Sequence, residues 1–191
     1  MMKQLMLLFI ALCIGQFSYA QKGLLSLNEH NQYTYFQVKP VSKPVSAELL
    51  AAYLKKNESG VQSATVVDNG GMAAKGGMLV YKQGLVTGQE DGQIAYKLTV
   101  DFKDNKYRLM ITDFMFTPYQ RNRFGVFAPT GITTPLEKAQ GKIRDKQLNN
   151  YLDKLGAYCA KVDKLIQNYI NNPEPAKSNP AGLKKIDTQN W

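Results

Sequence analysis

The sequence has little of the two residue types on which metal sites and nucleophilic catalysis most often depend. Its 191 residues include one histidine and two cysteines. His30 lies beside Glu29 in a polar stretch, whereas metal binding and Ser–His or Cys–His catalysis need partners held in a packed frame. We therefore predict that His30 is exposed and idle, and that the protein has no catalytic set, no metal site and no cofactor.

Cysteine is also too scarce for a disulfide framework. Cys13 falls in an N-terminal segment that we expect to be removed, which leaves Cys159 as the single thiol. A lone thiol in an oxidising compartment is either buried or a site of cross-linking. Because Cys159 lies on the apolar stripe of a predicted helix, we expect it to be a buried packing residue and not a nucleophile.

Long hydrophobic runs are absent after the N-terminus, and the one near it is short. Leu5 to Ile14 carries no charge, follows Lys3, and is about half the roughly 20 residues that a membrane-spanning helix needs. A basic start, a short apolar stretch and small residues before the cleavage point are typical of a secretory signal. We predict no transmembrane segment in the remaining chain.

The signal is predicted to cover residues 1–20, with cleavage between Ala20 and Gln21. The protein is then exported to the periplasm, or associated with the outer membrane or cell surface. An uncleaved anchor is the main alternative. Lipid attachment at Cys13 is a weaker one, because Leu12 stands where lipoprotein signals have a small residue.

Charge of one sign is in excess, since 24 basic residues face 15 acidic ones. Loss of Lys3 with the signal lowers the formal net charge from +9 to +8. A basic surface attracts anions in general, including nucleic acid, anionic lipid and polysaccharide. Export disfavours nucleic acid, so the expected partner is an envelope protein or an anionic glycan or lipid. Evenly spread lysines are also typical of an ordinary solvated surface.

Hydrophobic periodicity predicts one domain at residues 33–171, preceded by a polar leader at 21–32 and followed by a disordered tail at 172–191. The expected elements are strands at 33–38, 61–68, 72–82, 93–102 and 107–116, helices from 46 and from 136, and a long loop at 117–135. Gly76-Gly77 should mark a bulge or a close backbone approach.

The clearest local pattern is a hairpin turning at Lys103–Lys106. Apolar and polar residues alternate on both sides of the turn, which indicates one buried and one solvated face. The alternation changes phase between Thr112 and Phe116, as a bulge would cause. The element order predicts a two-layer α+β fold, with an antiparallel sheet of about five strands and both helices on one face.

Three features together resemble a family of exported bacterial proteins with an uncharacterised DUF4468-type domain and a TATA-binding-protein-like (TBP-like) fold. They are the signal ending in Ala20-Gln21, the helix start Ser46-Ala-Glu-Leu-Leu, and the hairpin 96–111, whose return strand opens at Tyr107 and Arg108. The similarity covers roughly residues 33–170. It implies the order strand, helix, four strands, helix, and it supplies no active-site residues; a fold name does not carry a function.

The best candidate for a functional surface is the segment from Thr117 to Gly125. Tyr119, Arg121, Arg123 and Phe124 place planar cations beside aromatic rings, a combination that binds anionic or carbohydrate ligands and forms protein hot spots. We add Arg108 as a further candidate binding residue. In the alternative reading, Tyr119 and Phe124 only anchor a loop to the sheet.

Two other functions remain open. An enzyme could use Asp113 if Arg108 or Arg121 lay beside it, since a buried carboxylate needs a partner. Nucleic acid could bind the solvated sheet face, but that face reads Lys97, Thr99, Asp101 and Arg108 and lacks the apolar wedges of minor-groove binders. An ion pair between Asp101 and Arg108 is the simpler expectation for that face.

Overall fold

The computed structural model of the protein describes residues 23–68, 70–83, 88–139, 141 and 143–173. The predicted signal peptide, its cleavage site at Ala20–Gln21 and residues 174–191 of the predicted tail lie outside the described residues. The elements are β1 (Ser26–Leu27), β2 (Tyr33–Pro40), α2 (Ala47–Asn57), β3 (Val61–Val66), β4 (Met72–Gln83), β5 (Gly88–Lys103), β6 (Lys106–Arg121), β7 (Phe127–Pro129), β8 (Thr134–Pro135), the 3-10 helix Leu136–Lys138, and α3 (Asp145–Asn171). None of the described helices combines the length and apolar character needed to cross a bilayer.

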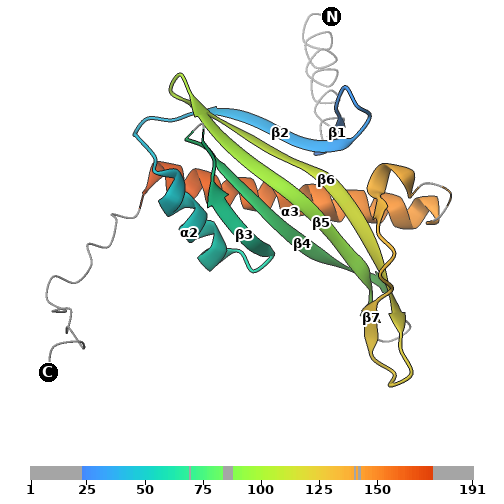
Figure 1. The fold of residues 1–191 in the computed structure, drawn as a ribbon. Coiled ribbons are helices and arrows are strands. Elements are labelled where there is room, and N and C mark those ends of the chain that lie inside the picture. Colours follow the sequence, from blue (N-terminus) through green and yellow to red (C-terminus); the bar gives the residue numbers. More distant parts are fainter. Residues whose placement is uncertain (1–22, 69, 84–87, 140, 142, 174–191) are drawn as a thin grey trace, which may run out of the picture.

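The strands form an antiparallel sheet with both helices on one face (Figure 1). Its main path is β1-β2-β6-β5-β4-β3, and β7 and β8 each pair with β6. The predicted α+β fold is confirmed, but the described residues form a sheet of eight strands, so the expected number of about five is wrong. The extra strands β1, β7 and β8 have two or three residues each, too few to show alternation in a sequence. One of them, β1, lies in the predicted polar leader.

The predicted hairpin joins β5 to β6. Lys103 pairs with Lys106, and the two residues between them, Asp104 and Asn105, have φ of 50° and 55°. Positive φ at both central residues characterises the type I′ turn, whose twist matches that of the flanking strands. The buried side chains then alternate along both strands as expected: Tyr96, Leu98 and Val100 on β5, and Tyr107, Leu109 and Ile111 on β6.

The predicted bulge lies at Asp113. The register between β5 and β6 shifts between Ala95 and Lys97, and Asp113 has φ of 55°. The extra residue changes the parity of β6, so that Phe114 and Phe116 reach the same core as Ile111. Asp is one of the few side chains that tolerate a left-handed backbone conformation.

Two expectations for residues 117–170 are wrong. The long loop at 117–135 is absent, because β6 continues to Arg121 and residues within that range form β7 and β8. Pro118 and the glycines interrupt the alternation of apolar and polar residues, so these strands give no periodic signal in the sequence. Proline is nevertheless tolerated at sheet edges. The second helix does not start at Leu136 either: a single 3-10 turn is followed by Gly141, with φ of 79°, and α3 begins only at Asp145.

Gly76-Gly77 is a site of close backbone approach, and an irregularity of the neighbouring strand lies opposite it. Pairing of β4 with β5 is continuous there, whereas the register between β3 and β4 shifts between Val61, opposite Gly76, and Ser63, opposite Lys75. A Cβ atom at Gly76 would lie 2.4 Å from the Gly60 carbonyl oxygen and 2.4 Å from the Tyr96 hydroxyl oxygen. Glycine is therefore required at position 76 because the neighbouring chain and the tyrosine ring occupy the space of a side chain.

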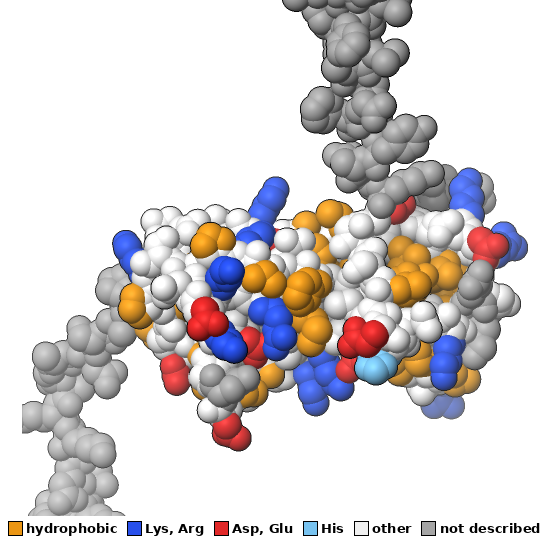
Figure 2. Space-filling model, turned by 90° about the horizontal axis from the view of Figure 1, so that it is seen from above, with side chains coloured by type: hydrophobic (Ala, Val, Ile, Leu, Met, Phe, Trp, Pro, Cys, Tyr) orange, Lys and Arg blue, Asp and Glu red, His pale blue; other side chains and the backbone are white. Residues whose placement is uncertain are grey.

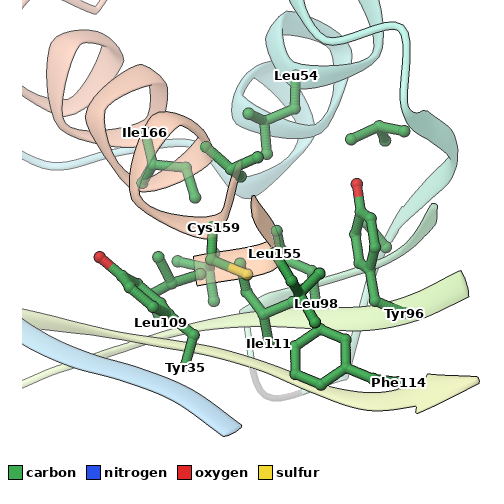
Figure 3. Packing of buried hydrophobic residues seen from close by; sticks show 14 of the residues in the cluster. Tyr35, Leu54, Tyr96, Leu98, Leu109, Ile111, Phe114, Leu155, Cys159 and Ile166 are labelled. Atoms are coloured by element: carbon green, nitrogen blue, oxygen red, sulfur yellow. The ribbon is translucent and has the colours of Figure 1, made fainter. Parts of the chain in front are cut away.

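The hydrophobic core lies between the helices and the sheet (Figure 3). Cys159 of α3 is buried there, as predicted, among Leu98, Ile111 and Leu155 (Figure 3). Burial raises the pKa of the Cys159 thiol to about 12, so it stays protonated at neutral pH and is a packing group. Leu54 brings α2 into the same cluster.

A buried carboxylate that the sequence analysis missed connects α3 to the sheet. Asp163 is 4% exposed and accepts hydrogen bonds from the hydroxyls of Tyr35 (3.0 Å) and Tyr107 (3.2 Å). Lys39 Nζ supplies the countercharge at 2.5 Å. Burial and then the nearby Asp163 carboxylate raise the pKa of both tyrosines, which keeps their hydroxyls protonated as donors. One sequence signal pointed to it, since Asp163 follows Cys159 by four residues on the apolar stripe.

We expect Asp163→Ala to lower the free energy of unfolding by about 3 kcal/mol or more, because it leaves two buried hydroxyls and a partly buried ammonium group without their acceptor. Urea unfolding followed by circular dichroism measures the effect. Asp153→Ala, on the exposed side of the same helix, is the matched control and should stay within about 0.5 kcal/mol of the parent. Equal losses in the two variants would contradict the role of the Asp163 cluster.

We expect Gly76→Ala to lower the free energy of unfolding by about 1–3 kcal/mol, since the added methyl group overlaps a backbone carbonyl that cannot move away alone. Lys75→Ala, at the neighbouring exposed position of β4, controls for the general effect of alanine in this strand. Thermal and urea unfolding of the three proteins provide the comparison. A Gly76→Ala protein as stable as its parent would show that the strands can separate at this point.

Candidate functional site

The predicted binding segment forms a two-stranded hairpin beyond the end of the main sheet. β6 pairs with β5 as far as Pro118, opposite Gly92, and its next three residues pair with β7. We call residues 119–129 the β6–β7 hairpin. Figure 1 shows it projecting from the body of the molecule, past the strands that the helices cover.

The turn of this hairpin is organised by Asn122. Its side-chain Oδ1 accepts hydrogen bonds from the backbone N–H groups of Phe124 (2.9 Å) and Val126 (3.1 Å). The Asn122 carbonyl oxygen accepts a further bond from the Gly125 N–H, and Gly125 has φ of 78°. A tight turn followed by a left-handed glycine is a common three-residue hairpin connection. The tip is therefore an ordered turn.

The arginines of the hairpin lie against its aromatic rings. Arg121 is directly opposite Phe127, and its guanidinium carbon is 5.4 Å from the ring centroid. The guanidinium carbon of Arg123 is 4.8 Å from the ring centroid of Phe124. Phe124 is 75% exposed, so it does not anchor a loop to the sheet. The hairpin thus presents stacked cation–aromatic pairs to solvent.

A cavity of about 580 Å³ lies at the base of the hairpin. Tyr119 lines it, and so do Ile132 and Arg144. On its inner side the carboxylate of Asp91 accepts hydrogen bonds from Gln147 and Tyr151 and forms an ion pair with Lys82 at 3.2 Å. The negative charge of Asp91 is thus compensated by Lys82, and its oxygen atoms have hydrogen-bond donors. The cavity is lined by this compensated polar group and by several apolar side chains.

Arg108 does not belong to this site. Its Nη2 and Nε atoms donate to Oδ2 of Asp101 at 2.8 Å and 3.1 Å, as the cross-strand pairing predicted. Arg108 and Arg121 stand thirteen positions apart on one strand, a separation of about 40 Å in extended chain. The structure therefore brings Tyr119, Arg121, Arg123 and Phe124 together and places Arg108 near the opposite end of β6.

Asp113 has a partner different from the two that were expected. Its Oδ2 lies 2.7 Å from Lys97 Nζ, and its side chain is 33% exposed. The expectation that Arg108 or Arg121 pairs with it is wrong, because both point to other groups. Asp113 is the extra residue of the bulge in β6. It does not line the cavity at the base of the hairpin.

The face of the sheet away from the helices is mixed in character. Arg108 pairs in register with Val38, and Met110 with Phe36, so these side chains share the face that also carries Lys97 and Asp101. Phe36 and Val38 are about half exposed. The expectation of a face without apolar side chains was therefore incomplete, because it considered β5 and β6 alone. Figure 2 shows hydrophobic side chains interspersed with lysines and arginines over the surface seen from above.

A second buried acid, Glu58, was also missed. It ends α2, its side chain is 4% exposed, and its Oε2 is compensated by an ion pair with Lys161 Nζ at 2.9 Å, not by a hydrogen bond. The Tyr158 hydroxyl donates to Glu58 Oε1 at 3.4 Å, and it is also hydrogen-bonded to the Tyr96 hydroxyl, with 2.8 Å between the two oxygen atoms. Burial raises the pKa of Tyr96 to about 12, so the tyrosine hydroxyls remain neutral. This cluster connects α2, α3 and the sheet.

Other chemistry-bearing residues are isolated. His30 lies in the exposed connection between β1 and β2, and its Nε2 is 3.8 Å from Glu29 Oε1. Within the described part of the chain, His, Cys, Asp and Glu side chains form no group of three or more that could hold a metal ion.

Residues 46–117 match the family described as a domain of unknown function, DUF4468, with TBP-like fold. A crystal structure of a DUF4468 family protein from Bacteroides ovatus is similar, with a TM-score of 0.54 and 12% identity over 81% of this chain and 95% of that one. A TBP-like protein from Parabacteroides distasonis is also found, with a TM-score of 0.47 and 15% identity over 72% and 94% of the two chains.

Comparison with curated proteins finds no significant match. At 12% identity, the similarity to the Bacteroides ovatus structure extends to the fold alone. Residues 46–117 thus resemble the DUF4468 domain, and the antiparallel sheet with its two helices has the TBP-like fold of that family.

Proposed function

We propose that the protein is an exported, non-enzymatic binding module of the cell envelope, and that it holds its partner through the β6–β7 hairpin. The observation that carries the proposal is the exposure of large apolar side chains next to arginines at the tip of the hairpin. Phe124 is 75% exposed and Val126 is 59% exposed, between Arg121 and Arg123 on one side and Phe127 on the other.

Folding does not account for this composition. A two-stranded hairpin gains little stability on its own, and an exposed Phe or Val adds nothing to the core. Exposed apolar side chains that cluster beside polar ones mark interaction surfaces, and arginine and aromatic residues are enriched among those that dominate binding energy. The structured turn at Asn122 further supports a binding role, because a preorganised surface loses little entropy when it meets its partner.

Export is supported by the N-terminal pattern alone. Lys3, the uncharged run from Leu5 to Ile14 and the small residues Ser18 and Ala20 follow the arrangement that signal peptidases recognise. An exported module meets envelope proteins, glycans and lipids, and nucleic acid is not its expected partner.

We expect the protein isolated from its native cell to begin at Gln21 and to be found in the periplasmic or outer-membrane fraction. Mass spectrometry of the intact protein from separated fractions measures both. Ala20→Leu should block processing, because a bulky residue does not fit the peptidase site. A native protein that retains Met1 and stays in the cytosolic fraction would contradict export and restore nucleic acid as a partner.

We expect the chain beginning at Gln21 to be captured by envelope fractions, and the pair Arg121→Ala/Arg123→Ala to reduce capture by about ten-fold, since arginine hot spots are worth about 1.4 kcal/mol or more. The control pair is Lys103→Ala/Lys106→Ala, at the turn between β5 and β6, which removes the same charge elsewhere. Quantitative sedimentation with washed envelopes provides the measurement. Unchanged capture of the arginine variant, or equal loss in both pairs, would reject the hairpin as the binding surface.

A further inference from the structure

We propose that the β6–β7 hairpin binds an anionic lipid surface, with Phe124 and Val126 inserted among the acyl chains and Arg121 and Arg123 at the level of the lipid phosphates. This inference rests on the proposed function, because it names the partner of the same hairpin. Three features of the tip support it: its positive charge, its exposed apolar side chains, and the hydrogen bonds made by its backbone N–H groups.

The charge of the hairpin itself has one sign. No acidic residue occurs between Asp113 and Glu137, and Arg121 and Arg123 are the charged residues of the hairpin. Anionic lipids create a negative surface potential that attracts clustered basic residues within about 10 Å of the surface. Guanidinium groups also bind phosphate oxygens through two parallel hydrogen bonds. The hairpin therefore complements a layer of anionic phosphates.

The apolar part of the tip lies where insertion requires it. Phe124 and Val126 belong to the turn, at the point farthest along the hairpin from the main sheet. Ile132, 69% exposed, adds a third apolar side chain next to the hairpin base. Arg123 stacks on Phe124, and such an arginine can enter the interface with the ring while its guanidinium remains among the headgroups.

The backbone of the tip is already prepared for a less polar medium. An unpaired N–H group is costly outside water, and this cost usually keeps turns out of lipid. Here the N–H groups of the two inserting residues, Phe124 and Val126, both donate to Asn122 Oδ1, and the Gly125 N–H donates to the Asn122 carbonyl oxygen. These three amides of the turn thus have acceptors within it.

The size of the tip favours lipid over a protein partner. A stable protein interface buries about 800 Å² on each side, usually with 20 or more residues. The projecting hairpin consists of residues 119–129, fewer than such an interface usually has on one side. A lipid surface needs no matching shape, and affinity for it comes from a few inserted side chains and basic contacts.

The test is co-sedimentation with vesicles of phosphatidylcholine mixed with phosphatidylglycerol, compared with vesicles of phosphatidylcholine alone. We use the chain from Gln21, which holds every described element, so that the apolar run before it makes no contribution. The parent protein should bind the anionic vesicles, and binding should weaken by about ten-fold or more at high salt, because the arginine contacts are screened.

Two pairs of substitutions separate the apolar from the basic contribution. Phe124→Ser/Val126→Ser and Arg121→Gln/Arg123→Gln should each reduce binding to anionic vesicles by about ten-fold or more. The matched controls are Phe36→Ser/Val38→Ser on the open sheet face and Lys103→Gln/Lys106→Gln at the β5–β6 turn, and both should bind like the parent. Circular dichroism checks that every variant is folded.

Fluorescence reports insertion directly. Trp191 is the only tryptophan, so Trp191→Phe removes the background signal. In that background, the emission of Phe124→Trp should shift to the blue on addition of anionic vesicles, whereas that of Phe36→Trp should not.

The outcomes separate this inference from the proposed function. Capture by envelopes without binding to anionic vesicles would overturn the lipid inference, and would leave the hairpin as a site for a protein or glycan. Vesicle binding that the hairpin variants retain, or a blue shift at position 36 and not at 124, would also overturn it. If washed envelopes do not capture even the parent protein, the proposed function is overturned.

Discussion

The sheet depends on the extra residue at Asp113 in β6. β6 pairs with β2, β5, β7 and β8, so its register determines the position of most of the other strands. Its first half buries Ile111 and its second half buries Phe114, and these residues have opposite parity along the strand. A regular strand would turn one half outward. The bulge reconciles the two halves, and the ion pair with Lys97 holds the carboxylate of a residue in a left-handed conformation.

Buried charge then determines how the helices are attached. Asp163 joins α3 to β2 and β6 through Tyr35, Tyr107 and Lys39, while Glu58 joins the end of α2 to α3 through Lys161. Each carboxylate has a cation within 3 Å, so neither is left as an uncompensated charge in the interior. Apolar packing alone would allow α3 to slide along the sheet, and these directional contacts select one position.

The β6–β7 hairpin lies outside this framework. It begins where β6 separates from β5, contributes little to the core, and carries arginines and exposed apolar side chains in place of the usual polar surface. Its sequence is free of the demands of the core, because residues 119–129 do not belong to the core cluster. The proposals on envelope and lipid binding follow from that freedom.

The sequence by itself determined the α+β class, the β5–β6 hairpin, the bulge near Asp113 and the burial of Cys159, because each leaves a local periodic signal within a few residues. It also identified Tyr119, Arg121, Arg123 and Phe124 as candidates from composition. Only the tertiary structure decided that strands form within residues 117–135, that Lys97 pairs with Asp113, and that Asp163 is a buried anchor. These depend on contacts between residues distant in the chain, and such contacts have no local periodicity.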